Sequence, residues 1–161
     1  MEYTIRKMEE RDVNPVQEVA KKSWNTTYEK IIPLEIQERF LDTAYNDEMM
    51  IKRLNGSYLY VAEKDQQIVG FANFSTVKEE GEVELGAIYL YPEYQGKGIG
   101  TALLHEGIKN LKGVKSIYIN VEKENSIGTN FYQAKGFEVI SEFDDNLEGH
   151  ITKMFRMVLS V

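Results

Sequence analysis

The stretch from Glu84 to Leu104 constrains the fold of this chain more than any other, because it predicts a strand, a glycine loop and a helix in direct succession. The strand must end before Pro92, since proline cannot donate a hydrogen bond to a β-ladder. Residues 95–100 then read QGKGIG, with a glycine at every second position. After Thr101 the apolar residues follow helical spacing. The sequence therefore places a flexible glycine loop at the start of a helix.

Glycines at the start of a helix let a ligand approach the backbone closely. The free N–H groups of the first helical turn and the helix dipole attract an anion such as phosphate. A turn that merely joins two elements is the alternative, and the glycines alone do not decide between them. The P-loop pattern does not fit, because Lys97 lies between glycines and Thr101 follows Gly100. The Rossmann fingerprint does not fit either, because the glycines are spaced G-x-G-x-G.

The flanking sequence predicts an α+β fold. We expect strands over residues 3–8, 58–63, 68–77, 84–90, 116–121, 137–143 and 151–159. We expect helices after an N-cap at Asp12, from Pro33 as first residue, and over residues 47–54, 102–111 and 126–135. The helix between residues 84–90 and 116–121 completes a βαβ unit, so these two strands should be parallel. The polar residues 144–149 predict a loop.

Composition limits the classes of protein that this chain can belong to. Its 161 residues, 42% of them hydrophobic, suffice for one domain over residues 1–161. No apolar run approaches the roughly 20 residues that cross a bilayer, and the N-terminus has no apolar signal-peptide core. The absence of cysteine excludes disulfides and thiolate catalysis. We therefore expect a cytoplasmic protein with no membrane partner. The net charge of −7 argues against nucleic acid as a partner and is compatible with a cationic substrate.

Two sequence blocks resemble the GNAT superfamily of N-acetyltransferases. Gln95, Gly98 and Gly100 match its Q/R-x-x-G-x-G/A signature. The second hallmark of the family reads close to N-x-x-A-x-x-F-Y-x-K-x-G-F. The matching positions here are Asn125, Phe131, Tyr132, Gly136 and Phe137. Two positions depart from the pattern, since Gly128 replaces the usual alanine and Lys135 lies one place later than the usual lysine.

The resemblance covers the chain from about Tyr58 to the C-terminus. It implies a GNAT fold, with a central mixed sheet of six to seven strands flanked by helices. It also implies an acetyl-CoA-dependent N-acetyltransferase that moves an acetyl group to a primary amine by direct attack. The acceptor would be a polyamine or other small amine, a drug, or a protein amine. The segment 23–54, with its W-x-x-x-Y pattern and following I-I-P, is similar to the PaiA-type polyamine acetyltransferases.

The family is often dimeric, so the resemblance is compatible with a homodimer. A non-catalytic acyl-CoA-binding sensor or scaffold on the same fold is the alternative function, because fold does not determine function. No metal site is predicted. His105 and His150 have no suitably spaced partners for zinc or for a catalytic triad.

The resemblance also assigns roles to particular residues. Tyr132 matches the tyrosine that acts as general acid toward the CoA sulfur, and the backbone N–H of Leu90 would stabilise the oxyanion. The backbone of Ile88 and Leu90, together with Asn125, would bind the pantetheine arm. The pyrophosphate would be bound by the loop and first helical turn, which comprise Gln95, Gly96, Lys97, Gly98, Ile99, Gly100 and Thr101.

Two further assignments each have a structural alternative. Glu84 is the candidate general base, because some family members carry a catalytic glutamate at this place on the same strand; otherwise it is a surface carboxylate. Trp24, Tyr28 and Tyr89 are candidates for the acceptor pocket, and the alternative is that they pack in the core.

Overall fold

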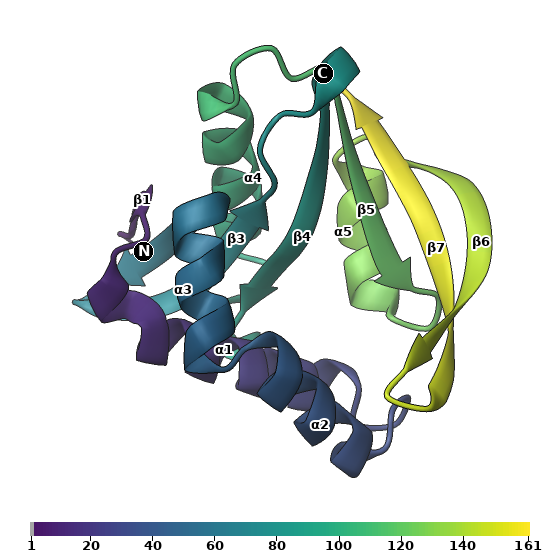
Figure 1. Cartoon of the computed structure of the whole chain (residues 1–161). Coiled ribbons are helices and arrows are strands. Elements are labelled where there is room, and N and C mark those ends of the chain that lie inside the picture. The colour runs from purple at the N-terminus through teal and green to yellow at the C-terminus, as the bar shows by residue number, and fades with distance from the viewer. Residues whose placement is uncertain (1) are drawn as a thin grey trace.

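The computed structural model describes residues 2–161, and the strands of this part form one mixed sheet in the order β1-β2-β3-β4-β5-β7-β6 (Figure 1). The strands are β1 (Thr4–Lys7), β2 (Tyr58–Lys64), β3 (Gln67–Phe74), β4 (Glu82–Leu90), β5 (Ser116–Glu122), β6 (Glu138–Leu147) and β7 (His150–Ser160). Strands β4 and β5 run parallel, as the βαβ prediction required, and the other neighbouring strands are antiparallel. The predicted α+β class with a mixed sheet is confirmed.

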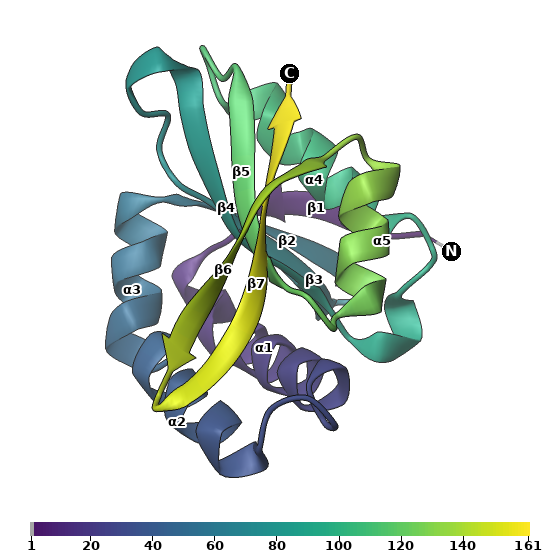
Figure 2. The ribbon, with the colours of Figure 1, turned by 90° about the vertical axis from the view of Figure 1, so that its right-hand side faces the viewer.

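Helices cover both faces of this sheet (Figure 2). They are α1 (Val13–Thr27), α2 (Leu34–Ala44), α3 (Asp47–Gly56), α4 (Ile99–Asn110) and α5 (Ser126–Ala134). Helices α1 and α3 lie on one face of the sheet, and α4 and α5 lie on the other. Helix α1 buries Val16, Val19 and Ala20 completely, and their three- and four-residue spacing places them on one face of the helix.

Each face of the sheet has its own apolar core. On one side Leu103 and Leu104 of α4 pack with Phe74 and Ile117, all at most 1% exposed. On the other side the apolar residues of α1 pack with Met50 of α3 and with Val61 and Phe71 of the sheet. Burial of this apolar surface holds the helices on the sheet and fixes the strand positions from which the site is built.

The side chains of strand β4 switch from one face of the sheet to the other in the middle of the strand. Phe74 of β3 is opposite Leu85, but its neighbour Asn73 is opposite Ala87, so Gly86 is one extra residue in β4. An extra residue reverses the alternation of side chains along a strand. Accordingly Leu85 lies in the core under α4, whereas Ala87 lies in the core under α1.

Strands β4 and β5 separate soon after they meet. Their pairing covers Glu82–Glu84 opposite Ser116–Tyr118. Beyond these residues the two strands diverge, which Figure 1 shows as a widening gap between β4 and β5. The sheet is therefore open between its two halves at the end where both strands terminate.

Two local predictions were wrong. Residues 144–147 belong to strand β6 rather than to a loop. Polar side chains are tolerated there because β6 is an exposed edge strand, where they remain in water. The turn consists of Glu148 and Gly149, which both have positive φ. Pro33 precedes the first helical residue, since its ψ of 142° is extended. Asp12 is the N-cap residue of α1, as predicted, but its side chain does not bond to this helix; its carboxylate accepts hydrogen bonds from the guanidinium of Arg6 at 2.7 and 3.0 Å.

Candidate active site

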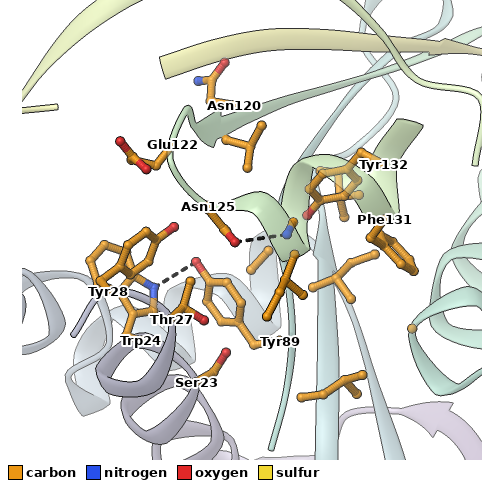
Figure 3. Close-up of a pocket in the computed structure, with 18 of the residues that line it drawn as sticks. Ser23, Trp24, Thr27, Tyr28, Tyr89, Asn120, Glu122, Asn125, Phe131 and Tyr132 are labelled. Carbon is orange, nitrogen blue, oxygen red and sulfur yellow. Dashed lines mark hydrogen bonds between the residues drawn. The ribbon is translucent and has the colours of Figure 1, made fainter. Parts of the chain in front are cut away.

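A cavity of about 600 Å³ lies where β4 and β5 diverge. Its walls come from the end of α1, the second half of β4, the glycine loop and start of α4, the end of β5, helix α5 and the β6–β7 hairpin. Figure 3 shows labelled side chains of α1, β4, β5 and α5 around a common space. The cavity thus joins both sequence blocks to the early helical segment, although these three parts lie far apart along the chain.

The glycine loop supplies a helix start without a side-chain cap. Gly98 is the N-cap residue of α4 with φ of +87°, a conformation that glycine adopts without strain. No side chain hydrogen bonds to the first-turn N–H groups of this helix in the described structure. These groups and the positive end of the helix dipole are therefore free to bind an anion. Five of the seven predicted loop residues line the cavity, namely Gln95, Gly96, Gly98, Gly100 and Thr101.

Two predicted loop residues do not line the cavity with their side chains. Lys97 is exposed, and Ile99 is fully buried in the core under α4. Ile99 occupies the first position of the helix, so it offers its backbone N–H rather than its side chain. Its apolar side chain anchors the start of α4 in the core and so fixes the position of the loop.

Strand β4 presents free backbone groups to the cavity. Tyr91 donates its N–H to the carbonyl of Val69 in β3 at 3.0 Å. In an antiparallel pair, alternate residues point toward the partner strand and away from it. Ile88 and Leu90 therefore direct their N–H and C=O groups away from β3, toward the side where the pairing with β5 has already ended.

Tyr132 approaches the cavity from the opposite wall, on α5. Its ring contacts Phe131 and Phe137 edge-on, with ring centroids 5.4 Å away in both cases. Figure 3 shows its hydroxyl pointing into the cavity. Burial raises the pKa of Tyr132 well above its usual value, and the nearby Tyr89 adds to the increase. The phenol therefore stays protonated throughout the neutral pH range and is able to donate a proton.

Asn125 has a structural role as well as a place on the cavity wall. Its Oδ1 accepts a hydrogen bond from the N–H of Gly128 at 2.9 Å and so caps α5. A Cβ atom at residue 128 would lie 2.6 Å from Asn125 Nδ2, which is too close. An alanine at position 128 would therefore require the side chain of Asn125 to shift.

The three aromatic candidates form the floor of the cavity. Trp24 donates its Nε1–H to the hydroxyl of Tyr89 at 2.9 Å, and its ring packs at 4.6 Å from that of Tyr28. Trp24 is 7% and Tyr28 8% exposed. Burial raises the pKa of both tyrosines. All three side chains line the cavity, with Trp24 and Tyr28 buried and Tyr89 partly buried, so their role in an acceptor pocket stays a prediction.

Glu84 is placed outside this cavity. It precedes the extra residue in β4, and it lies in a separate hollow with Arg53, Ser57 and Asn73. Arg156 of β7 binds its carboxylate with two guanidinium nitrogens, one of them at 2.9 Å and the other closer. A carboxylate that is held by a guanidinium outside the cavity is not within hydrogen-bond reach of a substrate in the cavity. This placement argues against Glu84 as the general base.

Replacing Glu84 with glutamine should lower stability rather than turnover. We expect a loss of about 1 kcal/mol in the free energy of unfolding, since the charge-assisted bonds to Arg156 are lost at a partly exposed site. Urea unfolding and steady-state kinetics measure the two effects separately. A turnover loss of more than about tenfold in a stable variant would restore the base assignment.

Sequence reasoning missed one carboxylate that does line the cavity. Glu122 ends β5 and is 5% exposed. Its Oε2 accepts a hydrogen bond from the N–H of Glu124 at 2.7 Å. Burial raises the pKa of Glu122 above its usual value, although backbone N–H groups act in the opposite direction. The sequence did contain one indication that Glu122 belongs to the site, because it lies at the carboxyl end of a predicted parallel strand, where open sheets bind ligands.

The stability of the protein should depend on this carboxyl group. A pKa that is raised by folding stabilises the protein below the pKa of the unfolded chain, and that contribution is lost as the pH rises through the folded pKa. We therefore expect Glu122→Gln to be more stable than the unchanged protein at about pH 8, with the difference disappearing near pH 3.5. Urea unfolding at both pH values measures this. A variant that is less stable at the higher pH would contradict the expectation.

Among residues 2–161, no helix is long and apolar enough to cross a membrane. Within the same described part of the chain, no three histidine or acidic side chains are grouped so that they could hold a metal ion.

Comparison with known proteins extends these observations. The model of the acetyltransferase (GNAT) family matches residues 18–137. A spermidine N(1)-acetyltransferase of Thermoplasma acidophilum is 33% identical over 147 residues, which cover 86% of this chain and 90% of that protein. The uncharacterized N-acetyltransferase YuaI of Bacillus subtilis is 34% identical over 150 residues, or 90% of this chain and 84% of the relative.

The fold is similar over the full length of a solved structure. PaiA N-acetyltransferase from Thermoplasma acidophilum, crystallised in complex with coenzyme A, matches with a TM-score of 0.89 over 100% of both chains, at 29% identity. The similarity therefore includes the early helical segment as well as the two sequence blocks.

Proposed function

Because this chain belongs to the GNAT family of acetyltransferases, we propose that it moves the acetyl group of acetyl-CoA to a primary amine of a small, cationic acceptor of the polyamine class. The observation that carries this proposal is the free edge of β4. The N–H and C=O groups of Ile88 and Leu90 face the cavity beside the uncapped start of α4. A strand edge next to an anion site suits a ligand with an amide-containing arm and a pyrophosphate.

The residues of the cavity fit this co-substrate. The N–H groups at the start of α4 would bind the pyrophosphate, with Gly96 and Gly98 allowing its close approach. Ile88 and Leu90 would bind the pantetheine amides as a neighbouring strand would. When bound, acetyl-CoA supplies the activated acetyl group. The relative from Thermoplasma, a spermidine N(1)-acetyltransferase, supports a polyamine as the acceptor.

Two groups of the chain would assist the transfer. The N–H of Leu90 donates a hydrogen bond to the carbonyl oxygen, on which negative charge develops as the amine attacks. Tyr132 donates its proton to the departing sulfur as general acid. The attacking amine releases one proton to solvent, and the Tyr132 phenolate regains one from solvent, so the transfer yields the amide and the CoA thiol. The direct attack requires no nucleophile from the protein, which agrees with a chain that has no cysteine. A homodimer, a cytoplasmic location and the absence of a nucleic-acid partner stay predictions.

A calorimetric titration with acetyl-CoA, followed by a screen of amines for release of the CoA thiol, tests this function. The cysteine-free chain gives no thiol background in the second assay. We expect one-to-one binding, with turnover on di- or polyamines. Binding without turnover of any amine would favour the acyl-CoA sensor instead. A folded sample that binds no acetyl-CoA would exclude both functions.

A further inference from the structure

The carboxylates of Asp12, Glu84 and Glu122 differ in whether a cationic side chain pairs with them. Asp12, which is 4% exposed, is paired with Arg6. Glu84, which is partly buried, is paired with Arg156. Glu122 is 5% exposed, yet it forms no salt bridge within residues 2–161. Buried charges are normally paired, because an isolated one is costly to remove from water. The N–H of Glu124 hydrogen bonds to this carboxylate, but the described chain supplies no positive charge to it, so a bound cation or a proton would be its counter-charge.

The surroundings of Glu122 favour an external cation. It lies on the cavity wall, where a ligand has access to it. Figure 3 shows Tyr28 on the same side of the cavity as Glu122; burial is the main cause that raises the pKa of Tyr28, and the charge of Glu122 adds a smaller increase. Asp145 of the β6–β7 hairpin lines the same cavity, so this side carries a second negative charge. Lys135, the cationic residue among the described lining residues, is on α5 with its Nζ 5.7 Å from the ring centroid of Phe131.

Glu122 is also set apart from the place of reaction. Figure 3 shows Glu122 and Tyr28 on one side of Asn125 and Tyr132 on the other. In the proposed function the reacting amine lies between Leu90 and Tyr132. A group that Glu122 binds is then a different part of the acceptor molecule.

We propose that Glu122 binds a second ammonium group of the acceptor, so that the cavity selects a diamine or polyamine over a monoamine of the same length. This inference rests on the proposed function, since it takes the Tyr132 side of the cavity as the place of acetyl transfer. The buried carboxylate acts as a charged anchor, and the cost of its burial is offset when the second ammonium pairs with it. A monoamine leaves the carboxylate unpaired and gains nothing from it.

The test compares 1,4-diaminobutane with n-butylamine, which has the same chain length and one ammonium group fewer. Glu122→Gln keeps the size of the side chain and the acceptor for the N–H of Glu124. We expect its KM for the diamine to rise roughly tenfold or more. Its kcat for the diamine and its KM for the monoamine should change little. The matched control is Glu124→Gln, which removes an exposed carboxylate two residues away and should alter neither KM.

Two outcomes would overturn the proposal. An equal loss of kcat with both amines would make Glu122 a proton acceptor or a structural residue, and an unchanged KM for the diamine would show that it binds no ammonium. A second readout needs no turnover. Calorimetric binding of 1,4-diaminobutane to the protein in complex with CoA should weaken by the same factor in Glu122→Gln. If the unchanged protein binds the diamine but acetylates no amine, the proposed function fails, and the difference in diamine affinity between it and Glu122→Gln still tests whether Glu122 binds an ammonium group. Equal diamine affinity in the variant would exclude that role.

Discussion

Replacing Tyr132 with phenylalanine is expected to lower kcat by about 10²- to 10³-fold, because a positioned general acid contributes roughly that factor. The affinity for acetyl-CoA should hardly change, since the ring and its contacts with Phe131 and Phe137 are kept. Stopped assays of CoA release, together with calorimetric titration of acetyl-CoA, separate the two quantities. Because the pKa of Tyr132 is raised, kcat should show no loss from its ionisation between about pH 7 and 9.

The matched control for this change is Tyr118→Phe. Tyr118 is a partly buried tyrosine of β5 that does not line the cavity, and its ring contact with Arg156 does not need the hydroxyl. Its kcat should stay close to that of the unchanged protein. If Tyr132→Phe retains full turnover as well, Tyr132 is not the acid, and the proton for the sulfur must come from solvent.

Replacing Thr101 with glutamate should weaken acetyl-CoA binding by roughly 100-fold. Thr101 is the third residue of α4 and lines the cavity at the proposed pyrophosphate site. A carboxylate here would repel the pyrophosphate across a few ångströms. The same charge is favourable to the helix, because it lies at the positive end of the helix dipole. The thermal midpoint should therefore not fall, so that loss of binding is separated from loss of folding.

Thr101→Gln adds the same bulk without the charge. The loss that both variants share is steric, and the remaining loss of the glutamate variant is electrostatic. Added salt should recover part of the second loss. If both variants lose affinity equally, the start of α4 crowds the ligand but does not hold an anion.

The sequence predicted the parts of the site that depend on the backbone. The strand before Pro92, the glycine loop and the parallel strand after α4 follow from local residue patterns, and five of the seven predicted loop residues line the cavity. Tyr132 and Asn125 lie there too, as the resemblance implied. The capping role of Asn125 is also a property of local sequence, since asparagine favours helix starts.

The parts that were missed depend on contacts between distant segments. Whether Glu84 or Glu122 faces the cavity depends on the extra residue at Gly86 and on where β4 and β5 stop pairing. Neither feature changes the apolar pattern along the sequence. The guanidinium that engages Glu84 lies 72 residues away, in the last strand. Charge pairing of this kind is decided by the tertiary fold, so a list of acidic residues does not indicate which of them is unpaired.

The divergence of β4 and β5 means that the protein contains a strand edge inside its sheet. Exposed strand edges usually invite a second chain to pair with them, and proteins protect them for that reason. Here the edge is recessed between the two halves of the sheet, where an extended peptide would have to enter past α5 and the β6–β7 hairpin. In the proposed complex a flexible, non-peptide arm would complete the ladder, as an added β-strand does in peptide recognition. The cofactor would then be a removable structural element that joins the two half-sheets, and each release of CoA would leave the edge of β4 unpaired again.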